Sequence, residues 1–278
     1  MRVSELVKFI VARYDIFEKR KFGIPPPWTT DRILQTYRFC NVHREEDTCT
    51  KWFAEAWRRE NAGHVDLWFN SLVYRFINWP PTAKEIGYTY SRWRPDWFLD
   101  AIHDREARGE KVYNAAYMVS THSVREKKSV YLAKSLTKIW GNRESIRYVP
   151  WEGLHSFHSR LMGQFDVGSF IAAQVVADCK YAGAPALAED WHTFAASGPG
   201  SKRGLNRVCG NDVKNMWKED VWHTTLLRLR EEVNPLLVKA GVPVLHAQDL
   251  QNCLCEFDKY ERVRLGQGVP KQLYRGGR

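Results

Sequence analysis

Polar side chains recur at helical spacing within residues 249–260. The spacing of three or four positions would place them on one face of a helix; they are Asp249, Asn252, Glu256 and Lys259. A carboxylate there could deprotonate an amine, an amide could form hydrogen bonds, and a cation could pair with phosphate. The alternative is a solvated helix face with one Glu–Lys pair, worth about 0.3 kcal/mol. Spacing alone leaves both interpretations open.

A second group of polar residues follows a helix that we expect to begin near Asp31. Arg38 and Asn41 are three positions apart, and Arg44 and Asp47 come next. Arginine suits a phosphate, asparagine suits a base edge, and aspartate suits an amine or a metal ion. A network of arginine and aspartate that ties helices together would explain the same residues.

Residues 197–208 combine glycines with cations. Successive backbone N–H groups, together with Lys or Arg, can hold an anion, so the segment predicts a phosphate-binding loop. It is not a P-loop, because GxxxxGK[ST] occurs nowhere in the chain. An ordinary Gly-rich surface loop is the alternative. The expected anion-binding residues are Gly198, Gly200, Ser201, Lys202, Arg203 and Arg207.

Residues 152–181 read as two helices joined by a short turn that starts and ends with glycine. This arrangement resembles the helix-hairpin-helix of DNA glycosylases. Glycine permits a sharp turn, and the N–H groups that begin the second helix can hold a DNA phosphate. An ordinary helix–turn–helix connection would look the same. The expected DNA-binding residues are Gly163, Val167, Gly168 and Ser169.

In glycosylases of that fold, a catalytic Asp follows the hairpin, shortly before an Arg-Val pair. The pair is present here as Arg207-Val208, but Lys202 or a neighbour occupies the position of the acid. The missing acid argues against base excision.

Helical periodicity dominates the whole chain and predicts an all-α fold of the helix-hairpin-helix glycosylase type. We find no hairpin signal between alternating strands. The clearest apolar stripes fall within residues 3–14, 65–77, 132–140 and 226–237, and Pro95 should open another helix over 96–108. We expect a helical domain over 1–265, built as one core or two lobes, and a flexible basic tail over 266–278.

The composition favours a polyanionic partner. The chain has 278 residues, a formal net charge of +10 and 12 tryptophans, a combination that suits double-stranded DNA and base stacking. The six cysteines form no CxxC pair, and the histidines are scattered, so we expect no metal site. Without a secretory signal or a membrane-length apolar run, the cytoplasm of a bacterium or phage-infected host is expected.

Three segments together resemble those of a known family: residues 27–47, the hairpin followed by 198–208, and residues 249–260. They resemble the α-glutamyl/putrescinyl thymine pyrophosphorylases, also called amino acid:DNA transferases. That family overlaps the helical domain of 5-hydroxymethyluracil DNA kinases. The similarity spans roughly residues 13–270. His43 and Cys49 depart from the expected pattern, which leaves the fine substrate preference open.

The resemblance implies a transferase that replaces pyrophosphate on 5-pyrophosphoryloxymethyl-uracil in DNA with an amine, an amino acid or a polyamine. A separate kinase would pyrophosphorylate the base, because this chain lacks a P-loop. The leaving group must be neutralised by cations or by Mg²⁺, and no other cofactor is expected. The expected catalytic residues are Asp249, Asn252, Glu256, Lys259 and Asp47. The alternatives are a glycosylase-like hydrolase and a helical DNA-recognition module that works beside a modification enzyme.

Overall fold

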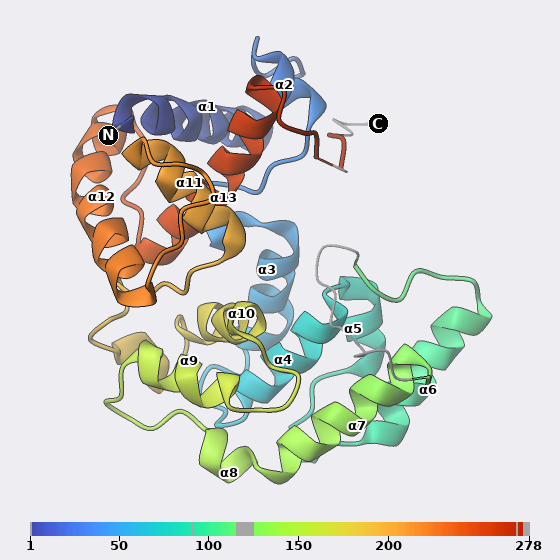
Figure 1. The fold of residues 1–278 in the computed structure, drawn as a ribbon. Helices are drawn as coiled ribbons and strands as arrows, with labels where there is room; N and C mark the ends of the chain where they lie inside the picture. Colours follow the sequence, from blue (N-terminus) through green and yellow to red (C-terminus); the bar gives the residue numbers. More distant parts are fainter. Residues whose placement is uncertain (1, 91, 115–124, 271, 275–278) are drawn as a thin grey trace. The chain divides into compact units, whose positions relative to one another are not determined.

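The computed structural model describes residues 2–90, 92–114, 125–270 and 272–274. Within these ranges the regular elements are α-helices and short 3-10 or π segments, which confirms the all-α prediction (Figure 1). The described residues contain no strand; a single antiparallel bridge joins Tyr37 to Leu273.

The chain divides into two compact units, and one of them is inserted into the other. Unit 1 combines residues 1–47 with residues 192–278, and unit 2 is the continuous stretch 48–191. The two parts of unit 1 pack together although the whole of unit 2 separates them in the sequence. Each unit is therefore described by itself.

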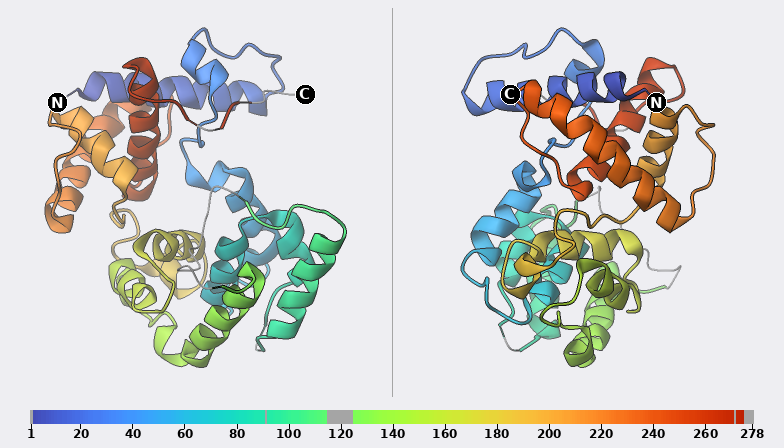
Figure 2. Two further views of the ribbon diagram at one scale, coloured as in Figure 1. Left: turned by 45° about the vertical axis from the view of Figure 1, so that its right-hand side comes forward. Right: turned by 90° about the vertical axis from the view of Figure 1, so that its left-hand side faces the viewer.

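Helix α13 is the centre of unit 1. It packs against α11, α12, α1 and α2, and α1 also packs on α12 (Figures 1 and 2). The helices of unit 1 are α1 (Val3–Lys21), α2 (Arg32–Thr36), η1 (Arg44–Glu46), α11 (Pro199–Cys209), α12 (Glu219–Lys239) and α13 (Ala247–Arg264). The apolar residues of their common core include Leu6, Ile10, Trp222, Leu250 and Leu254, each inaccessible to solvent.

Unit 2 is built around α4 (Leu67–Ile77), every residue of which is buried. Arg75 of α4 donates from Nε to Asp178 of α10 over 2.7 Å, a charged link inside the apolar core. The other elements are α3 (Thr48–Phe53), η2 (Ala54–Arg58), α5 (Pro80–Ile86), α6 (Pro95–Ala107), α7 (Lys128–Gly141), α8 (Arg143–Ile146), α9 (Leu154–Met162), α10 (Ser169–Cys179) and η3 (Ala184–Leu187).

The helices expected from apolar stripes all form, because each stripe packs into one of the two cores. Residues 3–14 lie in α1, 132–140 in α7 and 226–237 in α12, and Pro95 does open α6. The stripe at 65–77 starts later than expected: Val65 precedes α4 and is 61 % exposed.

Part of the expected flexible tail is held by backbone hydrogen bonds. Tyr274 donates its N–H to Thr36 O over 2.7 Å, and Arg38 donates its N–H to Gln272 O over 3.2 Å. The aromatic ring of Tyr274 also lies against Trp28. Residues 272–274 thus pair with the chain that leaves α2, and a flexible tail over 266–278 stays a prediction.

Candidate active site

The polar face of α13 holds the backbone of residues 38–44. As the spacing predicts, the four residues singled out in this helix lie on one face. Each of them binds a main-chain group of the same segment. In order along α13, Asp249 Oδ1 accepts from Arg44 N (3.0 Å), Asn252 Nδ2 donates to Asn41 O (3.4 Å), Glu256 Oε2 accepts from Cys40 N (3.0 Å), and Lys259 Nζ donates to Arg38 O (3.2 Å). The contacts give all four side chains a positioning role.

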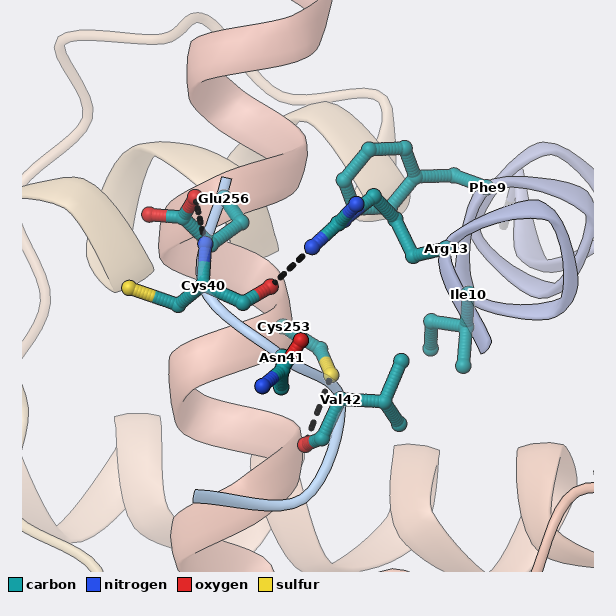
Figure 3. Close-up of a pocket in the computed structure, with 8 residues that line it drawn as sticks. All are labelled: Phe9, Ile10, Arg13, Cys40, Asn41, Val42, Cys253 and Glu256. Atoms are coloured by element: carbon teal, nitrogen blue, oxygen red, sulfur yellow. Dashed lines mark hydrogen bonds between the residues drawn. The ribbon is translucent and has the colours of Figure 1, made fainter. Parts of the chain in front are cut away.

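Helix α1 binds the backbone of residues 38–44 from the side opposite α13 (Figure 3). Arg13 of α1 donates from one guanidinium nitrogen to Phe39 O over 3.1 Å and to Cys40 O over 2.7 Å. Cys253 of α13 points its Sγ at Val42 O. The cavity that these groups enclose has a volume of about 10 Å³, room for one water at most. It is part of the packing and too small to admit a substrate.

Asp249 is held ionised between two imidazoles. Its Oδ2 lies 2.9 Å from His246 Nδ1 and 3.7 Å from His43 Nδ1, and the side chain is 3 % exposed. Burial alone would raise the pKa of this carboxyl. Contacts to the two histidines and the N–H of Arg44 more than offset burial, so the pKa lies well below its ordinary value.

Asp47 has the opposite electrostatic environment. Burial raises the pKa of this carboxyl to about 6, although the N–H of Asn41 and the charge of Arg44 act to lower it. Asp47 Oδ1 accepts from Asn41 N over 2.8 Å. The Asn41 amide donates to Glu46 O over 2.7 Å, so this donor closes a local turn. Residues 41–47 thus carry one carboxyl that gains a proton near neutrality.

The two arginines of residues 38–44 have different surroundings. Arg44 is buried, whereas Arg38 is exposed. Among the described residues, the side chain of Arg38 forms no ion pair. Arg38 is therefore the cation of the segment that can reach an anion from solvent.

The loop conformation expected at 198–204 is wrong, because these residues form the first turns of α11; anion binding by them stays a prediction. Pro199 opens this helix and Ser201 Oγ caps it by accepting from Gly198 N over 3.0 Å. A methyl group on Gly200 would overlap Cys255 Sγ, and one on Gly204 would overlap the carbonyl of Leu254. These two glycines permit α11 to pack closely on α13.

The cations of α11 are paired with acids. Arg203 Nε and Arg207 Nε donate to the two oxygens of Asp258 over 2.8 and 2.9 Å, and Arg207 is buried. Lys202 lies 3.4 Å from Glu219. Arg207 therefore has a buried acidic partner within unit 1, and its expected role as a phosphate ligand stays a prediction. The expected pairing of Asp258 with Arg262 is present at 3.5 Å.

The hairpin at 152–181 consists of α9, a turn and α10, as predicted. Val167 is buried under the turn, while no heavy atom lies within 4 Å of a Cβ built on Gly168, just before α10. The left-handed residue of the turn is Asp166, with φ of 65°; Gly163 and Gly168 have ordinary φ values of −68° and −75°. The left-handed residue thus lies between the two glycines, two positions before Gly168. Tyr131 donates to Asp166 Oδ1 over 2.7 Å and fixes that bend.

Sequence reasoning missed two residues that shape this site. Arg13 interrupts the apolar stripe of α1, and a charged residue in that position was a usable signal for a buried hydrogen-bonding role. His246 is the residue before α13. Its contact with Asp249 depends on the extended backbone that His246 adopts there.

Two other properties follow from the described residues. They contain no helix that is long and apolar enough to cross a membrane. Nor do they contain a group of three or more His, Cys, Asp or Glu side chains placed to hold a metal ion.

Comparison with known proteins gives one family and one curated relative. The family model for the helical domain of 5-hmdU DNA kinases matches residues 2–269. The chain is also similar to the 5-hmdU DNA kinase of Bacillus phage SP10, with 24% identity over 279 residues. That match covers 90% of this chain and 43% of the phage protein, so the chain spans less than half of the relative's length. No solved structure matches.

Proposed function

The chain belongs to the family of the helical domain of 5-hmdU DNA kinases, and from this premise we propose that it modifies 5-hydroxymethyluracil-derived bases in double-stranded DNA. The proposed reaction is the transfer of an amine to 5-pyrophosphoryloxymethyl-uracil. The net charge of +10 supports a polyanionic substrate. The α9–α10 hairpin supports DNA contact through the N–H groups that begin α10.

In the proposed step, the amine nitrogen forms a bond to the 5-methylene carbon. The bond from that carbon to the pyrophosphate oxygen breaks, and pyrophosphate leaves with the bonding electrons. The attacking nitrogen must lose one proton, which requires a base near it. The leaving group gains negative charge, which a cation stabilises.

The observation that carries this proposal is the contrast between Asp47 and Asp249. Both accept N–H groups of the segment 41–47, yet their environments move their pKa values in opposite directions. A general base works best with a pKa near the operating pH, and the value of about 6 for Asp47 suits that role. Asp249 remains ionised and orients His43 and His246.

Arg38 is the proposed contact for the departing pyrophosphate. Arg38 is exposed and lies in the same stretch, residues 38–47, as Asp47. Lys259 of α13 fixes the backbone of Arg38. In this proposal Asn252, Glu256 and Lys259 act through the segment that they position. Lys202 and Arg203 lie in the first turns of α11, beside Glu219 and Asp258, without the loop that was expected around them.

The test is mass spectrometry of nucleosides after the protein is incubated with pyrophosphorylated DNA and a mixture of amino acids and polyamines. We expect a base adduct that gains an amine and loses pyrophosphate. Asp47→Asn should reduce its rate by about 10²-fold or more and remove the limb of the pH profile near 6. Arg38→Ala should slow transfer, whereas Arg32→Ala, a matched exposed arginine of α2, should not. No adduct with any amine would refute the transferase proposal.

A second function is supported by the family itself, which describes one domain of a kinase. The chain would then recognise DNA and present the base to a phosphorylating enzyme. Under this alternative, adding the chain to a 5-hmdU DNA kinase should increase phosphorylated nucleoside and yield no amine adduct. The same mass spectrometry distinguishes the two functions. The missing acid before Arg207-Val208 leaves a glycosylase-like hydrolase without its expected catalytic residue.

A further inference from the structure

We propose that unit 2 carries a pocket for one unpaired nucleobase, located on the segment that joins α5 to α6. The pocket has a volume of about 260 Å³, and it is lined by residues 86–90, 92–94, 97 and 98. This inference deepens the proposed function, since a base that is modified in DNA must first leave the helical stack.

Buried partners in the rest of unit 2 fix the pocket segment. Asn70 of α4, 1 % exposed, binds both backbone groups of Thr89: Oδ1 accepts its N–H over 2.6 Å and Nδ2 donates to its carbonyl over 2.8 Å. Trp93 donates its indole N–H to Thr137 of α7 over 2.8 Å. The segment is thereby held at two points, so the pocket walls have a defined place.

Aromatic rings form the pocket, and two of them are largely accessible to solvent. Trp97 is 56 % exposed and Tyr90 is 63 % exposed, while Trp93 and Phe98 are buried beneath them. Tyr88 and Tyr90 lie with ring centroids 5.0 Å apart. Large exposed rings around a hollow are unfavourable in water unless something covers them, and a base offers a flat face of matching kind.

The charge at the pocket rim selects an anionic ligand. Arg94 lies over the ring of Trp97 at 4.1 Å and pairs with Asp96 at 2.8 Å. Arg92 is exposed and forms no ion pair within the part of the chain that the structure describes. Arginines at the rim would attract the phosphates that flank a base, and they would repel a polyamine.

The size of the pocket decides between a single base and a larger ligand. Sites for drug-sized molecules measure about 300–1,000 Å³, and this pocket lies slightly below that range. Its volume suits one base and excludes a duplex. Unpaired DNA is therefore the proposed ligand.

The experiment uses a labelled single-stranded oligothymidylate without modified bases, so its result does not depend on transfer activity. Anisotropy titration should show that Trp97→Ala and Tyr90→Ala bind it roughly 5- to 150-fold more weakly than wild type, the usual effect of losing one base stack. The control is Trp151→Ala, a tryptophan of unit 2 that is 85 % exposed and lies outside the pocket. It should bind like wild type.

Two further measurements make the outcome decisive. Urea unfolding checks that each variant is folded, and Arg92→Ala supplies a third variant whose exposed side chain leaves packing intact. Wild-type affinity in Trp97→Ala and Tyr90→Ala would overturn the pocket, even if amine transfer occurs. Competition by putrescine that disappears in Trp97→Ala would also overturn it, by assigning the pocket to the amine. Loss of oligonucleotide binding in these variants, without any transfer in the wild type, would support the pocket and refute the reaction.

Discussion

Glu256 of α13 accepts a hydrogen bond of 3.0 Å from the backbone N–H of Cys40, which lies 216 positions earlier in the chain. The same oxygen receives Lys259 Nζ over 2.6 Å. One carboxylate thus joins the two parts of unit 1 and neutralises a cation beside the join. Its first consequence concerns stability.

Glu256→Ala should destabilise the protein by about 1–3 kcal/mol, because it leaves the N–H of Cys40 without its partner. Glu256→Gln keeps an acceptor oxygen for that N–H and should cost less. Urea unfolding measures both, with the exposed Glu231→Ala on α12 as the control. Equal stability of Glu256→Ala and Glu231→Ala would show that the hydrogen bond from Glu256 to residues 38–44 contributes little to the free energy of unfolding.

Asp47→Asn should gain stability relative to wild type as the pH rises. The pKa of Asp47 in the folded protein is about 6, above its unfolded value of about 3.9, so the ionised carboxylate is penalised in the folded state. That penalty develops between pH 4 and pH 6 and is complete above pH 6. The advantage of the amide should therefore grow by on the order of 2–3 kcal/mol between pH 4 and pH 7. Unfolding free energies at four or five pH values provide the measurement; a constant difference would contradict the raised pKa.

Asp249→Asn should behave in the opposite way. The pKa of Asp249 is lowered in the folded protein, so its contribution to stability is present above the unfolded value of about 3.9 and is lost as the pH falls toward the folded one. At pH 7 the substitution should cost about 2–4 kcal/mol, since it removes the charge between His43 and His246. The cost should shrink below pH 4. Acid titration of both proteins by circular dichroism tests this, and a cost that persists unchanged at pH 3 would argue against it.

Gly204→Ala should separate α11 from α13. The new methyl group would overlap the carbonyl of Leu254, a backbone atom that cannot rotate away. We expect a loss of about 2 kcal/mol or more, as for other overpacked cores. The matched control is Gly141→Ala at the end of α7, where a Cβ meets nothing within 4 Å and the substitution should be neutral or stabilising by up to about 1 kcal/mol. Thermal unfolding compares the two.

Gly168→Asp should weaken binding to duplex DNA. The added carboxylate would stand at the start of α10, where the proposed phosphate contact lies, and the site has space for it. Gly63→Asp adds the same charge to another open position of unit 2 and serves as the control. Wild-type affinity should fall with salt by a slope of about 0.9 per neutralised phosphate, and Gly168→Asp should reduce that slope. Equal affinity of the two variants would remove the hairpin from the DNA interface.

The helices were predictable from sequence because each buries an apolar stripe of regular period. The stripe of α1 and that of α12 each pack into the core of unit 1, so local pattern and tertiary packing agree. The polar face of α13 was predictable for the same reason. What it binds was not, since main-chain atoms of residues 38–44 carry no sequence signature.

The error at α11 has a physical cause. Gly200 and Gly204 were interpreted as loop residues that approach a ligand, and in the structure they approach another helix. Glycine permits close contact in both cases, and composition does not distinguish them. Arg207 shows the same limit, because a cation that pairs with Asp258 and one that binds phosphate have the same residue type.

The insertion of residues 48–191 affects how the nascent chain folds during its synthesis. Residues 1–47 leave the ribosome before unit 2, but their packing partners α12 and α13 are made after it. At about 5–20 residues per second, translation of the intervening unit takes roughly 7 to 30 s. During that interval Leu6 and Ile10 have no core to enter. Helix α1 therefore presents an apolar face to chaperones until α12 and α13 have been synthesised.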